Sequence, residues 1–214
     1  MSIRFASYTL RTLDVPAASA FYDAVLGHHG DVVYPLHEQA VARGARPHWL
    51  AHVTTPEPDS LGAAWLAEGA QQLGPRPGGG LVMREPAGAL LALGPVATPS
   101  IAGVVWHVLR TDDAGAVDRY ARLFGWVPGP SMDVGSTGYR TLAYGPGEPA
   151  MGAVGALEPG VHPQWLCFFG VASLDRAFET ALAHGATGMR GELPDGRRFA
   201  VCDDPQGAAF GMME

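Results

Sequence analysis

Eight histidines are the first residues whose chemistry needs a test, because imidazole both binds metal ions and transfers protons. His48 and His52 are four residues apart in a segment whose apolar residues predict a strand, which separates them by about 13 Å. A zinc ion, whose bonds to nitrogen are about 2.1 Å long, does not bridge that distance. His37-Glu38 lacks the second histidine of an H-E-x-x-H motif, since Val41 stands in its place. We therefore expect no metal ion at either place.

His52 and His107 are candidates for a metal-free role. A lone imidazole acts as a base, or as a hydrogen-bond donor that holds a polar ligand, without a metal ion. The simpler alternative is a buried histidine whose ring binds a neighbouring backbone group. The direction of His107 depends on strand register, because a shift of one residue turns the side chain to the other face. No His and Asp stand at a spacing from Ser7 that would indicate a catalytic triad, so a hydrolase mechanism is not supported.

Composition excludes several classes of function. The net charge is −7, and all 14 basic residues are arginines that form no basic block, which argues against nucleic acid or an anionic membrane as partner. The absence of lysine excludes Schiff-base and P-loop chemistry. No apolar run is long enough to span a membrane and the first twenty residues lack a signal-peptide core, so we expect a cytoplasmic protein. Cys167 and Cys202 are too far apart for a C-x-x-C motif, and we interpret both as buried structural thiols.

Two pairs of segments show that the chain repeats itself. Pro-His-Trp-Leu-Ala-His-Val at 47–53 returns as Pro-Gln-Trp-Leu-Cys-Phe-Phe at 163–169. Further on, Glu-Pro-Ala-Gly-Ala at 85–89 pairs with Asp-Pro-Gln-Gly-Ala at 204–208. Self-similarity of this kind indicates duplicated structural units.

The repeat predicts two domains, 1–98 and 101–214, joined at 95–99. The second copy is longer by a segment around 128–160, whose pattern predicts strand, turn and strand. Its counterpart at 35–45 has no clear alternation, and the structure of this part of the first half stays open.

Each half is expected to begin with a strand that leads into a helix. Asp14 caps the first helix and Gly27 ends it, and Asp112 or Asp113 and Gly125 do the same in the second half. A second unit of strand, helix and further strands follows in each half, which is an α+β pattern. The predicted helices are Pro16–Leu26, Leu61–Ala67, Ala114–Phe124 and Leu174–Ala183; the predicted extended stretches are Ile3–Leu10, Trp49–Thr55, Gly80–Leu93, Val104–Leu109, Trp165–Val171 and Arg197–Met212.

In combination these motifs resemble the vicinal oxygen chelate superfamily, which includes glyoxalase I, bleomycin-resistance proteins and extradiol dioxygenases. The resemblance covers nearly the whole chain and implies an α+β fold: a tandem repeat of glyoxalase-like domains, with four βαβββ-type modules whose curved mixed sheets surround pockets. The motifs that carry it are Asp14…Phe21-Tyr22…Leu26-Gly27, Thr111-Asp112…Tyr120…Leu123-Phe124-Gly125-Trp126, Trp165-Leu166…Phe169-Gly170-Val171 and Asp204-Pro205-Gln206-Gly207-Ala208-Ala209-Phe210-Gly211.

The resemblance also implies where metal ligands would stand. Members with metal chemistry use His and Glu on the first and last strands of each module. The matching positions in this chain hold Ser7, Leu50, Val105 or Trp106, Leu166, Ala92 and Gly211. None of these side chains offers the carboxylate, imidazole or thiolate that a divalent ion needs. We therefore expect the fold without a metal site and without a cofactor.

The expected function is the binding of a small organic molecule, a metabolite or an antibiotic, in an apolar pocket of the longer second half. The alternative is a vicinal oxygen chelate enzyme, either metal-dependent or His-based, that acts as a lyase, isomerase or dioxygenase. We expect a monomer or a homodimer with no nucleic-acid or membrane partner. The candidate ligand-binding residues are Ser7, His52, Trp106, His107, Tyr139, Met151 and Phe168.

Overall fold

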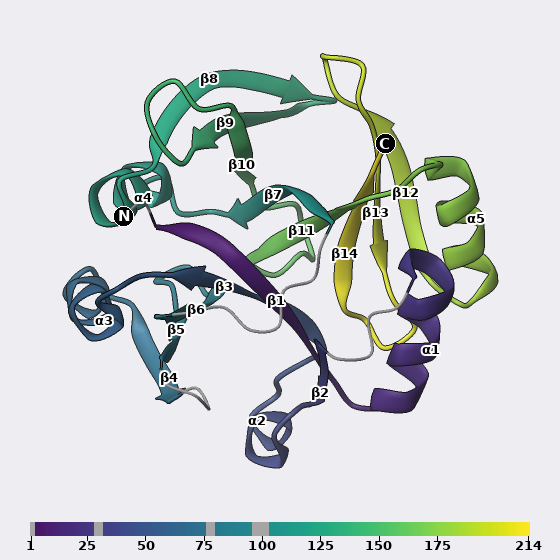
Figure 1. Cartoon of the computed structure of the whole chain (residues 1–214), viewed down its shortest axis with the longest axis horizontal. Coiled ribbons are helices and arrows are strands. Elements are labelled where there is room, and N and C mark those ends of the chain that lie inside the picture. Colours follow the sequence, from purple (N-terminus) through teal and green to yellow (C-terminus); the bar gives the residue numbers. More distant parts are fainter. Residues whose placement is uncertain (1–2, 28–31, 76–79, 96–102) are drawn as a thin grey trace. The chain divides into compact units, whose positions relative to one another are not determined.

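The computed structural model describes residues 3–27, 32–75, 80–95 and 103–214, and it is a mixed α+β fold with curved mixed sheets (Figure 1). Of the expected join at 95–99, only Pro95 lies within the described residues. The helices are α1 (Val15–Leu26), α2 (Glu38–Ala42), α3 (Pro58–Ala67), α4 (Ala116–Phe124) and α5 (Leu174–Ala183). The strands are β1 (Arg4–Thr12), β2 (Val33–Pro35), β3 (His48–Thr54), β4 (Gln71–Pro75), β5 (Leu81–Arg84), β6 (Leu90–Gly94), β7 (Val104–Thr111), β8 (Val127–Val134), β9 (Thr137–Ala143), β10 (Ala150–Ala156), β11 (Gln164–Gly170), β12 (Thr187–Glu192), β13 (Arg198–Asp203) and β14 (Ala209–Met213).

The strands form two mixed sheets. The order is β2-β1-β3-β6-β5-β4 in the six-stranded sheet and β12-β13-β14-β11-β7-β10-β9-β8 in the eight-stranded one. Hairpin neighbours such as β12 and β13 run antiparallel, whereas β3 with β6 and β11 with β14 run parallel. Parallel neighbours need a crossover connection, and α3 and α5 lie in those two connections.

The described chain divides into two compact units, each assembled from distant parts of the sequence. Unit 1 takes Met1–Ser7, Ala51–Ser100 and His107–Trp165. Unit 2 takes Tyr8–Leu50, Ile101–Trp106 and Leu166–Glu214.

Local sequence signals explain how α1 starts and stops. The Asp14 carboxylate accepts a hydrogen bond from the Ala17 amide at 3.0 Å, and Gly27 follows the last turn with φ of +86°. Both features were predicted and both are confirmed. The buried residues of α1 recur at helical spacing, and the helix packs beside α5 in unit 2 (Figure 1). They are Ala18, Phe21, Tyr22 and Val25.

The start of α4 differs from the prediction, and the structure settles the segment at 35–45 that the sequence left open. Neither Asp112 nor Asp113 caps α4, because the residue before the helix is Gly115. The Asp113 carboxylate instead accepts from the Gly115 amide at 2.8 Å, which makes a turn ahead of the helix. The predicted end at Gly125 is confirmed, with φ of +70°. The segment left open in the first half contains the short helix α2.

Aromatic side chains fill the core of each unit. Unit 2 packs Tyr22 edge-on against Trp49 and Phe210, with ring centroids 5.1 and 5.3 Å apart. Unit 1 stacks Tyr120 on Trp126 at 5.0 Å. Cys167 and Cys202 are free and buried, as predicted.

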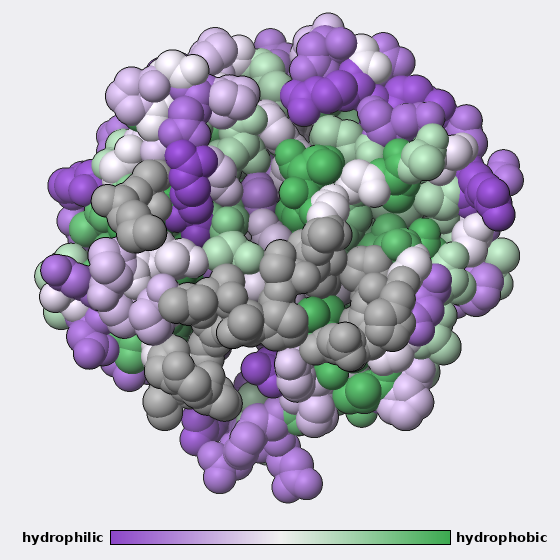
Figure 2. Space-filling view, in the orientation of Figure 1, coloured by the Kyte–Doolittle hydropathy of each residue, from purple (hydrophilic) through white to green (hydrophobic). Residues whose placement is uncertain are grey.

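On the face drawn in Figure 2, hydrophilic residues dominate the periphery and apolar residues show in smaller groups between them. In the parts of the chain that the structure describes, no helix combines the length and apolarity needed to cross a membrane.

Candidate functional site

Glu85 lies at the centre of a buried polar network in unit 1. It follows β5 and begins the Glu85-Pro86-Ala87-Gly88 turn, and only 2% of it is exposed. Its Oε1 atom accepts hydrogen bonds from the Tyr120 hydroxyl of α4 and from the Trp165 indole of β11, the latter at 3.2 Å. The same indole N–H also donates to the Tyr120 hydroxyl at 2.8 Å. Three elements thus meet at one carboxyl group.

Burial raises the pKa of Glu85 to about 7, because a low-dielectric environment disfavours the carboxylate. The hydrogen bonds from Tyr120 and Trp165, and the positive charge of Arg119, act in the opposite direction and are weaker. Within the described residues, Glu85 Oε2 has no hydrogen-bond partner. Glu85 is therefore a group that holds a proton near neutral pH.

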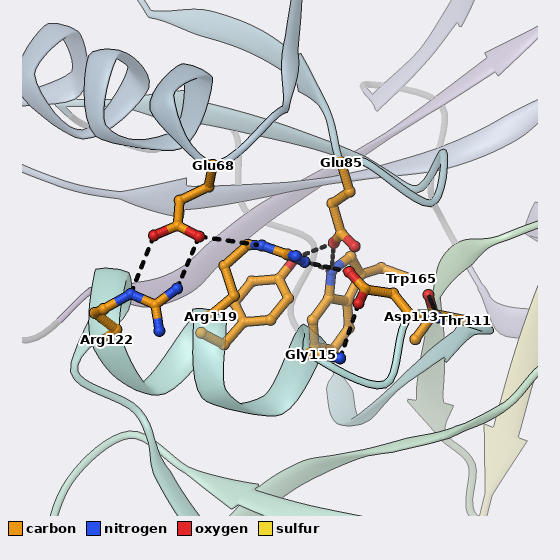
Figure 3. Close-up of polar contacts among 9 residues, drawn as sticks. Glu68, Glu85, Thr111, Asp113, Gly115, Arg119, Arg122 and Trp165 are labelled. Carbon is orange, nitrogen blue, oxygen red and sulfur yellow. Dashed lines mark hydrogen bonds and ion pairs between the residues drawn. The ribbon is translucent and has the colours of Figure 1, made fainter.

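Ion pairs surround this network on the side of α4 (Figure 3). Arg119 pairs with Asp113, and its Nε atom lies 3.9 Å from Glu68 Oε2. Arg122 binds both oxygens of Glu68, at 3.1 and 2.7 Å. These charges neutralise one another at the margin of the network, which leaves the Glu85 proton as its titratable feature near neutral pH.

Unit 2 contains a related network around Asp204. The Tyr22 hydroxyl donates to Asp204 Oδ2 at 3.0 Å, and the Trp49 indole donates to the Tyr22 hydroxyl at 3.0 Å. Asp204 Oδ1 accepts from the amides of Gln206 and Ala208 at 2.8 and 2.9 Å. Both oxygens of this buried carboxylate therefore have partners.

Trp106 and Phe168, two of the predicted ligand-binding residues, belong to unit 2 and are buried. The Arg197 guanidinium lies over the Trp106 ring, 4.7 Å from its centroid, and its Nη1 atom reaches the Met213 sulfur at 3.7 Å. The Phe168 ring covers Gly211 on the neighbouring strand: a Cβ atom at Gly211 would lie 2.3 Å from Phe168 Cδ1. A side chain at position 211 therefore has no room unless Phe168 moves.

His107, Met151 and Tyr139 belong to unit 1. The His107 ring stacks on Phe5 with centroids 4.0 Å apart, and its Nδ1 atom is 2.9 Å from the Met151 carbonyl oxygen. Burial lowers the pKa of His107 to about 4, so the imidazole is neutral at pH 7. The structure thus brings His107 and Met151 together through a backbone contact. Tyr139 instead binds Arg110.

Ser7 and His52, the remaining candidates, are buried in unit 1. Ser7 Oγ has no hydrogen-bond partner among the residues that the structure describes. His52 lies opposite Ala92 in the parallel register of β3 with β6. Nowhere in 3–27, 32–75, 80–95 and 103–214 do three or more His, Cys, Asp or Glu residues gather as a group that could hold a metal ion.

Sequence reasoning missed four residues that the structure places in polar clusters: Glu85, Arg110, Glu158 and Arg197. A signal existed for two of them. Arg110 directly follows the mostly apolar predicted strand Val104–Leu109, and a charged residue next to such a run indicates a buried partner. Glu85 occupies the position of Asp204 in the repeated turn motif. Glu158 and Arg197 lie beside turns, outside the strands, and carry no comparable signal.

Comparison with known proteins agrees with this architecture. No family model matches the sequence. The chain is 25% identical to the "Putative glyoxylase CFP32" of Mycobacterium bovis and of Mycobacterium tuberculosis, over 96% of this chain and 92% of each relative. Among solved structures, 2,2',3-trihydroxybiphenyl 1,2-dioxygenase from Sphingomonas wittichii matches with a TM-score of 0.67 at 10% identity, covering 100% of this chain and 90% of that one. The Mn(II)-bound glyoxalase from Novosphingobium aromaticivorans matches with a TM-score of 0.62 at 16% identity, covering 99% and 81%.

The chain has the fold of the vicinal oxygen chelate superfamily. The glyoxalase-like and dioxygenase-like resemblance read from the sequence is therefore confirmed at the level of the fold. In that fold the resemblance puts the ligand positions of the last strands at Ala92 and Gly211. In this chain Ala92 lies beside His52, and Gly211 lies under the ring of Phe168.

Proposed function

We propose that this chain binds a small organic molecule on the vicinal oxygen chelate fold and does so without a resident divalent metal ion. The observation that carries the proposal is the Phe168 ring over Gly211. An aromatic ring fills the space into which a metal-binding carboxylate would project, and neither residue offers a donor atom to a hard or borderline cation.

The same part of unit 2 supports ligand binding. Trp106 supplies a flat aromatic surface, and the half-exposed guanidinium of Arg197 lies over it. Small-molecule sites usually combine apolar lining with a few polar groups that fix orientation. Phe168 and Phe199, whose ring centroids are 6.2 Å apart, extend the apolar part.

The proposal includes an internal duplication, with four βαβββ-type modules in two domains at 1–98 and 101–214. Its support is the pair of similar networks, in which Trp49, Tyr22 and Asp204 correspond to Trp165, Tyr120 and Glu85. Superposition of the two halves in an experimental structure tests it: the two tryptophans should fall on equivalent strands.

Metal analysis and probe binding test the function. Protein purified without added metal should contain far less than one divalent ion per chain, and EDTA should leave the melting temperature unchanged, because a bound ion stabilises the folded state by mass action. The fluorescent probe 8-anilinonaphthalene-1-sulfonate should bind about 1–3 kcal/mol more weakly to Trp106→Ala and Phe168→Ala. Leu182→Ala, an exposed residue of α5, is the matched control.

Two results would contradict the proposal. About one Mn, Fe, Ni or Zn ion per chain, with a clear loss of stability on chelation, would support the alternative of a metal-dependent enzyme. Equal probe affinity in all three variants would remove Trp106 and Phe168 from the site.

A further inference from the structure

Arg110 and Tyr139 are brought together in unit 1 by strand register. Gly155 of β10 lies opposite Arg110 of β7 on one side and opposite Tyr139 of β9 on the other. A Cβ atom at Gly155 would lie 2.2 Å from Tyr139 Cε1. The glycine therefore gives the Tyr139 ring room to cross β10 and reach the guanidinium.

The contact leaves hydrogen-bond donors available at one place. Arg110 Nη1 donates to the Tyr139 hydroxyl oxygen, and the guanidinium carbon lies 5.4 Å from the ring centroid. Because the Tyr139 oxygen accepts that bond, its own O–H proton remains for another acceptor. Burial raises the pKa of Tyr139, so the hydroxyl keeps this proton at neutral pH. A planar guanidinium beside a phenol is well suited to a carboxylate.

A carboxylate already occupies this place. Glu158 Oε1 lies 2.7 Å from Arg110 Nη2. The two side chains differ in exposure, since 11% of the Arg110 side chain is accessible and 57% of that of Glu158. Ion pairs with an exposed partner contribute little to stability, so another anion can displace Glu158. The buried cation stays in place and keeps its need for a negative partner.

We propose that Arg110 and Tyr139 form a binding site for the carboxylate of a small organic acid, and that Glu158 occupies this site when no acid is bound. The proposal goes beyond the function proposed above, because it concerns unit 1 and needs neither Trp106 nor Phe168. Glu158 then acts as an internal competitor that an incoming acid displaces.

Benzoate is a suitable probe, with its binding to the full chain measured by isothermal titration calorimetry and ligand-observed NMR. Glu158→Ala should tighten benzoate binding roughly 2- to 5-fold, because the competing carboxylate is gone. Arg110→Met should weaken it roughly tenfold or more, and Tyr139→Phe by a smaller factor. Arg140→Met removes an exposed arginine next to Tyr139 and should leave the affinity unchanged. Benzamide, which lacks the charge, should not respond to Glu158→Ala.

The outcomes separate this proposal from the previous one. If Arg110→Met and Glu158→Ala both keep the wild-type benzoate affinity, the site does not exist. If benzoate binding falls in Trp106→Ala and not in Arg110→Met, the acid binds in unit 2 and this proposal is wrong while the proposed function stands. If circular dichroism shows that Arg110→Met does not fold, Arg110→Lys and Glu158→Ala are the tests that remain. The proposal is wrong if Glu158→Ala does not tighten benzoate binding.

Discussion

The two turns that begin with Asp204 and Glu85 have matching backbone hydrogen bonds, and their first side chains differ in length by one methylene group. In unit 2 the Gly207 amide donates to the Asp204 carbonyl at 2.9 Å, and in unit 1 the Gly88 amide donates to the Glu85 carbonyl at 2.9 Å. Each turn carboxyl accepts from a tyrosine whose hydroxyl also accepts from a tryptophan indole. The two networks therefore use the same residue types in the same order.

The extra methylene of Glu85 changes what the carboxyl group can bind. Asp204 is short enough to fold back on its own turn, where it accepts two backbone amides with one oxygen and Tyr22 with the other. Glu85 reaches further from its turn, binds Tyr120 and Trp165 with one oxygen, and leaves Oε2 without a partner among the described residues. Side-chain length therefore decides whether a buried turn carboxylate stabilises the turn or holds a proton.

Removing each carboxyl group should change the free energy of unfolding the most. Asp204→Ala should lower the free energy of unfolding by roughly 3–5 kcal/mol, because it leaves Tyr22 and two turn amides without their acceptor. Glu85→Ala should cost at least about 1 kcal/mol less at neutral pH, because it also removes an unpartnered buried oxygen. Urea denaturation at pH 7.5 measures both, and equal losses of stability would show that the extra methylene of Glu85 makes no difference.

The second effect concerns pH. Glu85 has a pKa of about 7 in the folded chain against an ordinary value of 4.5, so the folded state binds more protons between these values and its stability falls as pH rises through them. Glu85→Gln cannot ionise. Its free energy of unfolding relative to wild type should therefore rise by up to about 3 kcal/mol between pH 4.5 and pH 8.

His107 provides a control of opposite sign in the same unit. Its pKa is about 4 in the folded chain against 6.5, so its contribution to stability rises with pH between these values. His107→Asn should lose that rise, and Glu85→Gln should keep it. A stability difference between Glu85→Gln and wild type that does not change with pH would show that Glu85 stays ionised throughout.

The smallest changes in stability should come from exchanging the two carboxyl side chains, that is, from Asp204→Glu and Glu85→Asp. Asp204→Glu should cost about 1–3 kcal/mol, because the longer side chain moves its carboxyl away from the amides of Gln206 and Ala208. Glu85→Asp should change stability by less than about 1 kcal/mol while lowering the pKa of the turn carboxyl, since a shorter side chain gains access to its own turn. Denaturation curves across the pH range measure both variants. A larger loss in Glu85→Asp than in Asp204→Glu would show that the turns differ in more than side-chain length.

The parts of the fold that sequence predicted are those with apolar periodicity or a definite capping residue, such as α1 between Asp14 and Gly27. The strands that it missed include β2, β4 and β12, which are all edge strands, and most residues of β4 and β12 are polar or glycine. β4 and β12 are largely exposed, and an exposed strand has no buried face for apolar alternation to mark. The Asp113 side chain was misjudged because Asp suits a turn as well as a cap.

The candidate sites were less predictable than the fold. Trp106 and Phe168 follow from the strand pattern, but the ring of Phe168 over Gly211 is a cross-strand contact that depends on register. The raised pKa of Glu85 and the pairing of Arg110 with Tyr139 arise where three strands or helices meet. No local pattern contains that information.

Unit 2 is assembled from three separate segments of the sequence, and this slows its folding. Tyr22 binds Asp204 across 182 residues, so the aromatic core that contains Tyr22 and Trp49 cannot form completely until the segment around Asp204 has been made. Contacts between such distant residues slow folding, because the entropy of closing a long loop is lost before the contacts form. During synthesis on the ribosome, the strands and helices at 8–50 are therefore made long before their partners in unit 2, whereas every segment of unit 1 has been made once Trp165 is added.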